Sequence, residues 1–304
     1  MGFQIGCSVK MTGENTAKKD RDPIFTICLA IFLVAAVIAL GSFVVKEYFP
    51  SGDETASTGD TVTVDYIGTY YDAYGEKNAV VFDTNISSIG NDDDIQKSND
   101  WTEKTTYSGL KFKIGDKTML EGFENAVIGH KVGETVKVYL TASEGYVGPS
   151  TEGKMSTVGN MIESTQFVSK KDFSELYPDI TLEEGKAITF ESKYKFPAQA
   201  ILTNSGRDVL VTYFPVVGET YEAYKQGETT VEFKATSVGD IIVFDIIIKN
   251  TVTVDDEGHI QMIKLELEEN IYITAVNGTE ITYKTGSEKI NQPLYFEIKI
   301  TNIE

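Results

Sequence analysis

Residues that usually carry covalent, metal or proton-transfer chemistry are scarce in this sequence. His130 and His259 are its only histidines, and His130 lies in a Gly-His-Lys turn where a surface position is expected. Cys7 and Cys28 are its only cysteines, so the chain beyond them can form neither an internal disulfide nor a thiolate metal site. The sequence contains no glycine-rich phosphate loop, no HExxH and no nucleophile elbow. We therefore expect no cofactor and no metal.

The side chains that stand out instead are aromatic or apolar, and one of them lies next to a carboxylate. Phe82 is followed at once by Asp83, and Phe123 follows Leu120 at a spacing of about one helical turn. Taken singly, each aromatic residue is expected to be an ordinary core residue, because large aromatic side chains are mostly buried. The informative feature is therefore the order in which these pieces follow one another along the chain.

Five short blocks occur in a fixed order, and each is weak evidence by itself. They are VDYIG (64–68), VFDT (81–84), LKFKIG (110–115), MLEGFE (119–124) and IGHKVGE (128–134). Their order and spacing resemble an FKBP-type peptidyl-prolyl cis/trans isomerase over residues 60–148. Residues 143–148 (SEGYVG) are similar to the family's flap, and residues 293–300 (PLYFEIKI) resemble its closing strand.

The resemblance implies a pocket for a proline ring and a role for each residue that lines it. The catalytic residues would be Tyr66, Phe82, Asp83, Leu120, Phe123 and Tyr146, and the substrate-binding residues Leu110, Phe112, Met119 and Phe296. Phe123 and Leu120 would form the floor, and Phe82 and Phe296 the walls. The Leu120 backbone N–H and the Tyr146 hydroxyl would hold substrate carbonyls. Asp83 would make a polar contact, either to Tyr66 or to the carbonyl of the twisting bond.

The reaction that the resemblance implies needs no nucleophile, metal or proton relay. Amide resonance opposes rotation about the X–Pro bond with a barrier of roughly 18–20 kcal/mol. The twisted transition state loses this resonance and much of the charge separation between oxygen and nitrogen. An apolar cleft that excludes water should therefore favour the twisted amide over the planar amide, which water solvates better.

Strands and one helix are expected to position these residues. Val62, Val64 and Tyr66 alternate with polar neighbours, which predicts a strand over 61–69. The same alternation predicts strands over 110–114 and 136–140, and apolar residues at helical spacing predict one helix over 119–128. Residues 85–106, which include three consecutive aspartates, are polar and are predicted to form a long exposed loop.

The remaining chain is predominantly β-patterned. Candidate strands cover 186–191, 209–214, 229–235, 241–249, 260–267, 271–276 and 294–303. The predicted fold class is α+β and mostly antiparallel β: an FKBP-like sheet wrapped on one short helix, a β-rich inserted domain, and a preceding transmembrane helix. Because prokaryotic members of the family often carry a β domain in the flap, the isomerase domain would comprise 60–148 and 289–304, with 149–288 inserted. Closure of the sheet at 241–249 is the alternative.

A membrane segment is predicted near the N-terminus. Residues 23–45 contain no charge, and at 1.5 Å per residue they are long enough to cross a bilayer core of ~30 Å. Basic residues upstream predict a cytoplasmic tail over 1–22, a linker over 46–59 and an extracytoplasmic location for the rest. A cleaved signal peptide is the alternative for this segment. The sequence would thus be a membrane-anchored prokaryotic form with an enlarged insert in the flap.

The expected partners are unfolded or proline-containing polypeptides and, through the N-terminal helix, a membrane. A formal net charge of −19 argues against a nucleic-acid partner, whose binding surface should be basic. The predicted function is a prolyl isomerase that assists the folding of exported or membrane-associated proteins, with the insert binding unfolded segments. The alternatives are a folding chaperone with weak or no isomerase activity, and a structural cell-surface β protein.

Overall fold

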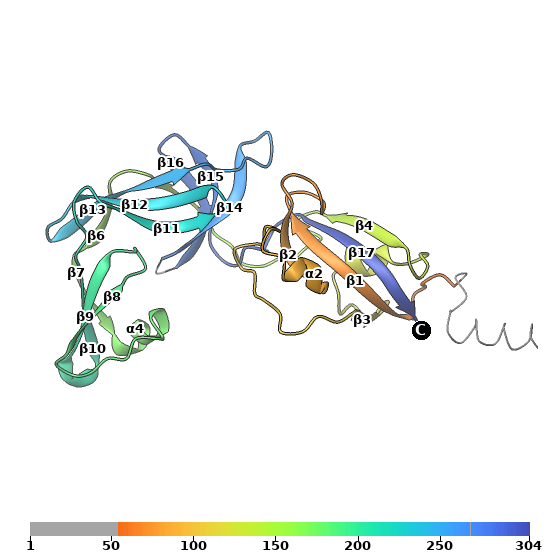
Figure 1. Ribbon diagram of the computed structural model, residues 1–304, viewed down its shortest axis with the longest axis horizontal. Coiled ribbons are helices and arrows are strands. Elements are labelled where there is room, and N and C mark those ends of the chain that lie inside the picture. The colour runs from red at the N-terminus through yellow and green to blue at the C-terminus, as the bar shows by residue number, and fades with distance from the viewer. Residues whose placement is uncertain (1–53, 268) are drawn as a thin grey trace, which may run out of the picture. The chain divides into compact units, whose positions relative to one another are not determined.

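The computed structural model describes residues 54–267 and 269–304. These residues are mostly antiparallel β structure with three short α helices, α2 (Ser87–Gly90), α3 (Glu121–Ala126) and α4 (Lys170–Leu176) (Figure 1). The strands form one five-stranded sheet and three four-stranded sheets. Two separate clusters of buried apolar side chains result, one under the first sheet and one shared by the other three.

The first sheet is assembled from both ends of the described chain. Its strands are β1 (Thr61–Tyr70), β2 (Val80–Thr84), β3 (Leu110–Lys113), β4 (Thr135–Leu140) and β17 (Leu294–Ile303). They lie in the order β2-β1-β17-β4, and β3 pairs with β1 (Figure 1). The alternation read from the sequence of β1 buries Val62, Val64 and Tyr66. Helix α3 adds Phe123 to the same core.

The C-terminal strand closes this sheet. β17 pairs with β1 over Val62↔Ile303 to Thr69↔Tyr295, and with β4 over Leu294↔Leu140 to Lys299↔Thr135. β13 (Ile241–Lys249), the alternative closing strand, pairs instead with β12 (Thr229–Ser237) and β6 (Asn160–Glu163). The first sheet therefore joins segments that more than 150 residues of intervening chain separate.

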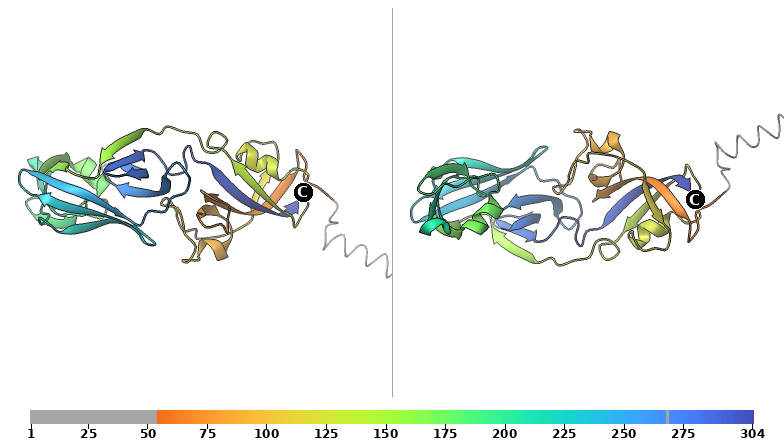
Figure 2. Two further views of the ribbon diagram at one scale, coloured as in Figure 1. Left: turned by 90° about the horizontal axis from the view of Figure 1, so that it is seen from above. Right: turned by 90° about the horizontal axis from the view of Figure 1, so that it is seen from below.

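Residues Glu152–Lys284, which we refer to as the β5–β16 region, form the other three sheets. β5 (Glu152–Ser156), β6 and β7 (Thr165–Ser169) follow one another along the chain, yet each joins a different sheet (Figures 1 and 2). The remaining strands are β8 (Ala187–Glu191), β9 (Pro197–Thr203), β10 (Asp208–Tyr213), β11 (Thr220–Gln226), β14 (His259–Glu266), β15 (Asn270–Asn277) and β16 (Glu280–Lys284), and one 3-10 turn spans Asn204–Gly206. The sheets are β7-β10-β9-β8, β11-β12-β13-β6 and β14-β15-β16-β5.

Gly68 allows two aromatic rings to lie close to the backbone of β1. A Cβ atom at this position would lie 2.7 Å from the ring of Phe82 and 2.9 Å from the ring of Phe296, closer than carbon atoms pack. Any larger residue here would push both rings away from the strand. The glycine is therefore required by the packing of the aromatic cluster described below.

The predicted fold class needs correction. The described residues contain three α helices rather than one, because α2 and α4 are too short to give a helical pattern of apolar residues. In α4 only Phe173 is buried, and the helix is started by the Ser169 side chain, which accepts a hydrogen bond from the Asp172 N–H at 3.1 Å.

A transmembrane helix is not part of the described fold. No helix in residues 54–267 and 269–304 combines the length and apolar character that crossing a bilayer requires. The predicted span over 23–45, its tail and most of the linker lie outside the described residues. The predicted membrane location and the exported clients stay predictions of the sequence.

The sequence predicts an exposed loop between β2 and β3, and this prediction is wrong for part of the loop. It begins with α2, and further on Ser98 is only 6% exposed. Its backbone runs beside β2, where the Val81 N–H donates to the Gln96 carbonyl at 3.0 Å and the Ser98 N–H to the Val81 carbonyl at 2.9 Å. Long-range hydrogen bonds hold this polar segment, and no pattern within the segment itself signals them.

Candidate active site

Aromatic rings from four elements meet in the core of the first sheet. The rings of Phe123 on α3 and Phe296 on β17 pack edge to face with centroids 5.1 Å apart, and those of Tyr66 and Phe123 do so at 5.7 Å. Phe82 on β2 lies 5.6 Å from Phe296 and stacks on Tyr70 at 4.6 Å. Such contacts add to the stability gained by burying apolar surface.

The other predicted pocket residues adjoin this cluster. Phe112 is buried with its ring 5.9 Å from that of Phe123. Partly buried side chains pack against the same cluster, namely those of Leu110, Met119, Leu120 and Tyr146. Every predicted aromatic or aliphatic site residue therefore belongs to one assembly. Phe123 and Phe296 are only 4% and 5% exposed, so they form its interior, and the half-buried Phe82 lies nearer the solvent.

Leu120 lies where α3 begins and has extended backbone angles. Its carbonyl accepts the first helical hydrogen bond, from the Glu124 N–H at 2.9 Å. Within the part of the chain that the structure describes, its own N–H donates to no other residue. This amide is the group that the resemblance assigns to a substrate carbonyl.

An open cleft of about 190 Å³ lies over one side of the cluster. Of the predicted site residues, Phe82, Asp83 and Tyr146 line it. The rest of its lining comes from residues that the sequence did not suggest: Tyr70, Ser98, Asp100, Ser287 and Lys289. Ser98 and Asp100 belong to the loop between β2 and β3, and Ser287 and Lys289 belong to the segment that returns from β16 to β17. The cleft is therefore apolar on one side and polar on the other.

Asp83 is held by two partners at the edge of the aromatic cluster. The Tyr66 hydroxyl donates to Asp83 Oδ2 at 2.6 Å, and Lys104 Nζ donates to Oδ1 at 2.5 Å and to the Thr84 carbonyl at 2.7 Å. Burial, followed by the bond to Asp83, raises the pKa of Tyr66 far above its ordinary value. Of the two contacts left open by the sequence, the structure contains the one to Tyr66. Asp83 thus contributes a fixed charge beside the cleft.

No spacing in the sequence points to Lys104. It lies 21 residues from Asp83 in a segment that reads as solvated and acidic. Its side chain is one-third exposed, and Nζ lies 5.8 Å from the centroid of the Tyr66 ring. The only hint is the enlarged length of the loop, and length alone does not indicate which residue returns to the site.

A polar junction fixes the same loop to the β5–β16 region and to the return segment. Glu288 Oε1 accepts a hydrogen bond from Asn99 Nδ2 at 2.7 Å, and Oε2 accepts one from the Asp100 N–H at 3.1 Å. The Asp100 carboxylate in turn accepts the Tyr272 hydroxyl at 2.8 Å and lies 3.1 Å from Lys264 Nζ. The loop that lines the cleft is therefore held in place from outside the first sheet.

Two buried ionisable groups in this junction titrate near neutral pH. Glu288 is 1% exposed, and burial raises the pKa of its carboxyl group to about 7. Lys284 is 5% exposed, and burial lowers the pKa of its ammonium group to about 8. Lys284 Nζ donates to the carbonyls of Glu288 and Ile290 at 2.8 and 2.7 Å. The junction is thus satisfied by hydrogen bonds, while its protonation depends on pH.

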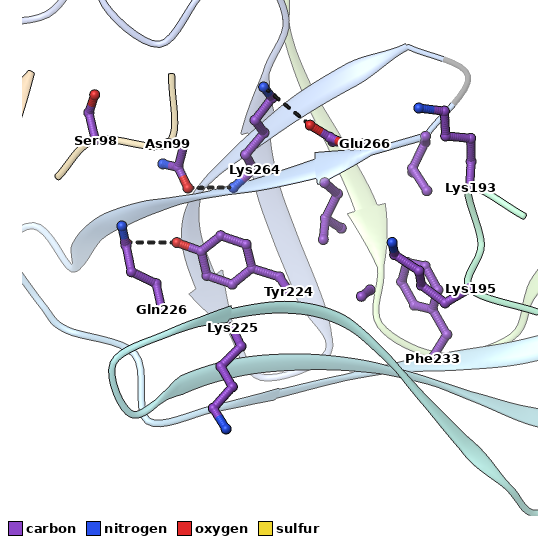
Figure 3. Close-up of a pocket in the computed structure, with 13 residues that line it drawn as sticks. Ser98, Asn99, Lys193, Lys195, Tyr224, Lys225, Gln226, Phe233, Lys264 and Glu266 are labelled. Carbon is purple, nitrogen blue, oxygen red and sulfur yellow. Dashed lines mark hydrogen bonds and ion pairs between the residues drawn. The ribbon is translucent and has the colours of Figure 1, made fainter. Parts of the chain in front are cut away.

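A second hollow, of about 290 Å³, is lined in part by Ser98 and Asn99 of the same loop (Figure 3). Ser98 lines both hollows. The second is lined by Lys193, Lys195 and Lys264 around the buried Phe233 (Figure 3). The loop therefore contributes residues to both the cleft and the second hollow, whose lining also includes Glu266.

Asp255, Glu257 and His259 are the candidate metal ligands among residues 54–267 and 269–304. All three are exposed, and Asp255 Oδ2 already lies 2.6 Å from His259 Nδ1. None of them lines the cleft. They offer no metal chemistry to the candidate active site.

Comparison with known proteins covers most of the first sheet and part of the cleft lining. Residues 52–162 match the family model for FKBP-type peptidyl-prolyl cis-trans isomerases. A short-type peptidyl-prolyl cis-trans isomerase of Methanocaldococcus jannaschii is 34% identical over 88 residues, which cover 29% of this chain and 48% of that protein. Trigger factor from Lactobacillus delbrueckii subsp. bulgaricus is 29% identical over 124 residues, 41% of this chain and 21% of trigger factor. Residues 52–162 are therefore similar to FKBP-type peptidyl-prolyl cis-trans isomerases, and the chain spans at most about half of either relative.

The junction generates a prediction for stability against pH. In the unfolded chain Glu288 ionises near its ordinary pKa of 4.5, whereas in the folded chain it keeps its proton up to about pH 7. Its stabilising contribution is therefore complete below pH 4.5 and is lost as pH rises to about 7. We expect the free energy of unfolding of the wild type, minus that of Glu288→Gln, to fall by about 2 kcal/mol between pH 5.5 and 8.

Urea denaturation of both proteins at several pH values measures this difference. The range stays above the sequence pI of 4.6. The amide that Glu288→Gln introduces turns an N–H donor toward Asn99 or Asp100. The loss of stability that this causes does not depend on pH, so it does not affect how the free-energy difference changes with pH. Glu103→Gln, which changes an exposed residue of the same loop, is the matched control. Its difference from wild type in free energy of unfolding should not change with pH. A difference between wild type and Glu288→Gln that is constant with pH would contradict the assigned ionisation.

Proposed function

We propose that this protein catalyses cis/trans isomerisation of prolyl bonds in the cleft lined by Phe82, Asp83 and Tyr146. The observation that carries the proposal is an open cleft lined by the aromatic rings of Tyr70, Phe82 and Tyr146, which lie in the segment that matches the FKBP-type family model and pack against the buried aromatic cluster. A proline ring placed against Phe82 would lose water on that face. The planar, more polar amide is then destabilised relative to the twisted amide.

Two hydrogen-bond donors are available to orient the substrate. The Leu120 N–H has no partner within the described residues, and the Tyr146 hydroxyl is on a cleft-lining side chain. Bonds to substrate carbonyls on either side of the prolyl bond would hold the flanking chain while the bond turns between them. Rotation needs no proton transfer, so the absence of a histidine from the cleft lining is no obstacle.

Asp83 has an electrostatic role in this proposal. Its carboxylate, held by Lys104 and the Tyr66 hydroxyl, would place negative charge beside the rotating amide. It also orients the Tyr66 hydroxyl. Removing the charge should slow turnover without abolishing it, because the apolar wall and floor remain.

Truncating the apolar wall tests the isomerase proposal. Phe82→Ala should lower kcat/KM for a short prolyl peptide by about tenfold to hundredfold, since burying an aromatic side chain is worth roughly 1.5–3 kcal/mol. A protease-coupled assay measures the rate. The matched control is Tyr139→Ala, which removes an aromatic side chain that is 51% exposed on the same sheet and does not line the cleft. Full activity in Phe82→Ala, or equal losses in both variants, would show that the site is misplaced.

We also propose that the β5–β16 region binds unfolded polypeptides through apolar side chains on its surface. Large apolar side chains are exposed there on segments that hydrogen-bond to one another. Met161 on β6 is 69% exposed and Phe167 on β7 is 72% exposed. Between them, the Ser164 N–H donates to the Asp240 carbonyl, next to the exposed Ile241. Exposed apolar side chains of this size are candidate contacts for a polypeptide partner.

Charged substitutions on these side chains separate the two activities. In the double variant Met161→Asp, Phe167→Asp we expect unchanged kcat/KM on a short prolyl peptide, because neither residue lines the cleft. Suppression of aggregation of a chemically unfolded protein should require about tenfold more of the variant. Val158→Asp, at another 51% exposed position of the β5–β16 region, is the control and should behave as wild type. Equal potency of all three proteins would exclude this surface as the binding site.

A further inference from the structure

Charged side chains that line the cleft differ in whether they have a partner. Asp83 is paired with Lys104, and Asp100 is paired with Lys264 and bonded to Tyr272. Lys289 is exposed and forms no ion pair with any carboxylate in residues 54–267 and 269–304. The one uncommitted charge on the described wall of the cleft is therefore positive.

This cation lies beside a group that the proposed function places against the substrate. Lys289 Nζ is 4.8 Å from the centroid of the Tyr146 ring. A substrate carbonyl on the Tyr146 hydroxyl would bring the residue flanking the proline to the same rim of the cleft. The ammonium group contacts only the face of a ring there, so an acidic side chain can approach it without displacing an existing ion pair.

Lys289 provides local positive charge on an acidic chain. The chain carries a formal net charge of −19, which would repel acidic polypeptides over most of its surface. At the cleft the carboxylates of Asp83 and Asp100 are each paired with a neighbouring lysine. Local attraction can therefore act on a flanking residue although the overall charge is unfavourable, because exposed charges are screened beyond about 8–10 Å at physiological salt.

We propose that Lys289 is a specificity-determining residue that makes this isomerase prefer prolyl bonds flanked by an acidic residue. The proposal rests on the proposed isomerase function and names the substrate class of that cleft.

The test uses three prolyl peptides that differ only in the flanking residue, which is Glu, Gln or Lys. For the wild-type protein at low salt we expect kcat/KM for the Glu peptide to exceed that for the Lys peptide by about two- to fivefold. The difference should lie in KM, because the ion pair forms equally in the planar and twisted states, and it should shrink as salt is added. Lys289→Gln should remove the preference, and Lys289→Glu should reverse it.

Lys113→Glu is the matched control, since it changes the net charge equally at an exposed position of the same domain that does not line the cleft. It should keep the preference for the Glu peptide. Equal rates for all three peptides in the wild type, or a preference that survives in Lys289→Glu, would overturn the specificity proposal and leave the isomerase function standing. A wild-type protein that accelerates none of the peptides would overturn both.

Discussion

Asp83 lies at the edge of an apolar cluster, and its pairing with Tyr66 and Lys104 links the loop between β2 and β3 to this edge. Because the Asp83 side chain is 37% exposed, water screens its charge in part, and the ion pair with Lys104 stabilises the folded chain by about 1 kcal/mol or less. Tyr66 is supplied by the neighbouring strand β1. Lys104 comes from the loop, and it can reach Asp83 only when the preceding residues are placed correctly.

Those preceding residues are placed by groups that belong to the other end of the chain. Asn99 and Asp100 bind the buried Glu288, which follows β16, and the side chain of Asp100 binds Tyr272 and Lys264 of the β5–β16 region. The apolar cores of the two parts are separate, so these polar contacts connect them. Near its end, this loop contacts the candidate active site through Lys104. In its middle, it contacts the β5–β16 region through Asp100.

The sequence predicts the parts of this site that depend on local pattern. Burial of one face produces the alternation of apolar residues in β1 and β17 and the helical spacing of Leu120 and Phe123. The aromatic cluster could therefore be expected from the order of residues in the sequence. The polar rim could not be expected in the same way. The contact of Asn99 with Glu288 joins residues 189 positions apart, and no periodicity encodes it. The same reason hides Lys104, while α2 and α4 are too short to show a helical pattern.

The most direct test of this account is a double-mutant cycle on Asp83 and Lys104, with kcat/KM for a short prolyl peptide as the readout. If Lys104 acts on the cleft through the charge of Asp83, then Lys104→Met should lower activity in the wild-type background and have little further effect in Asp83→Asn. The double variant would then be about as active as Asp83→Asn alone. Additive losses would contradict the account, since they would mean that Lys104 and Asp83 affect the cleft independently and that the loop is not coupled to the site through this pair.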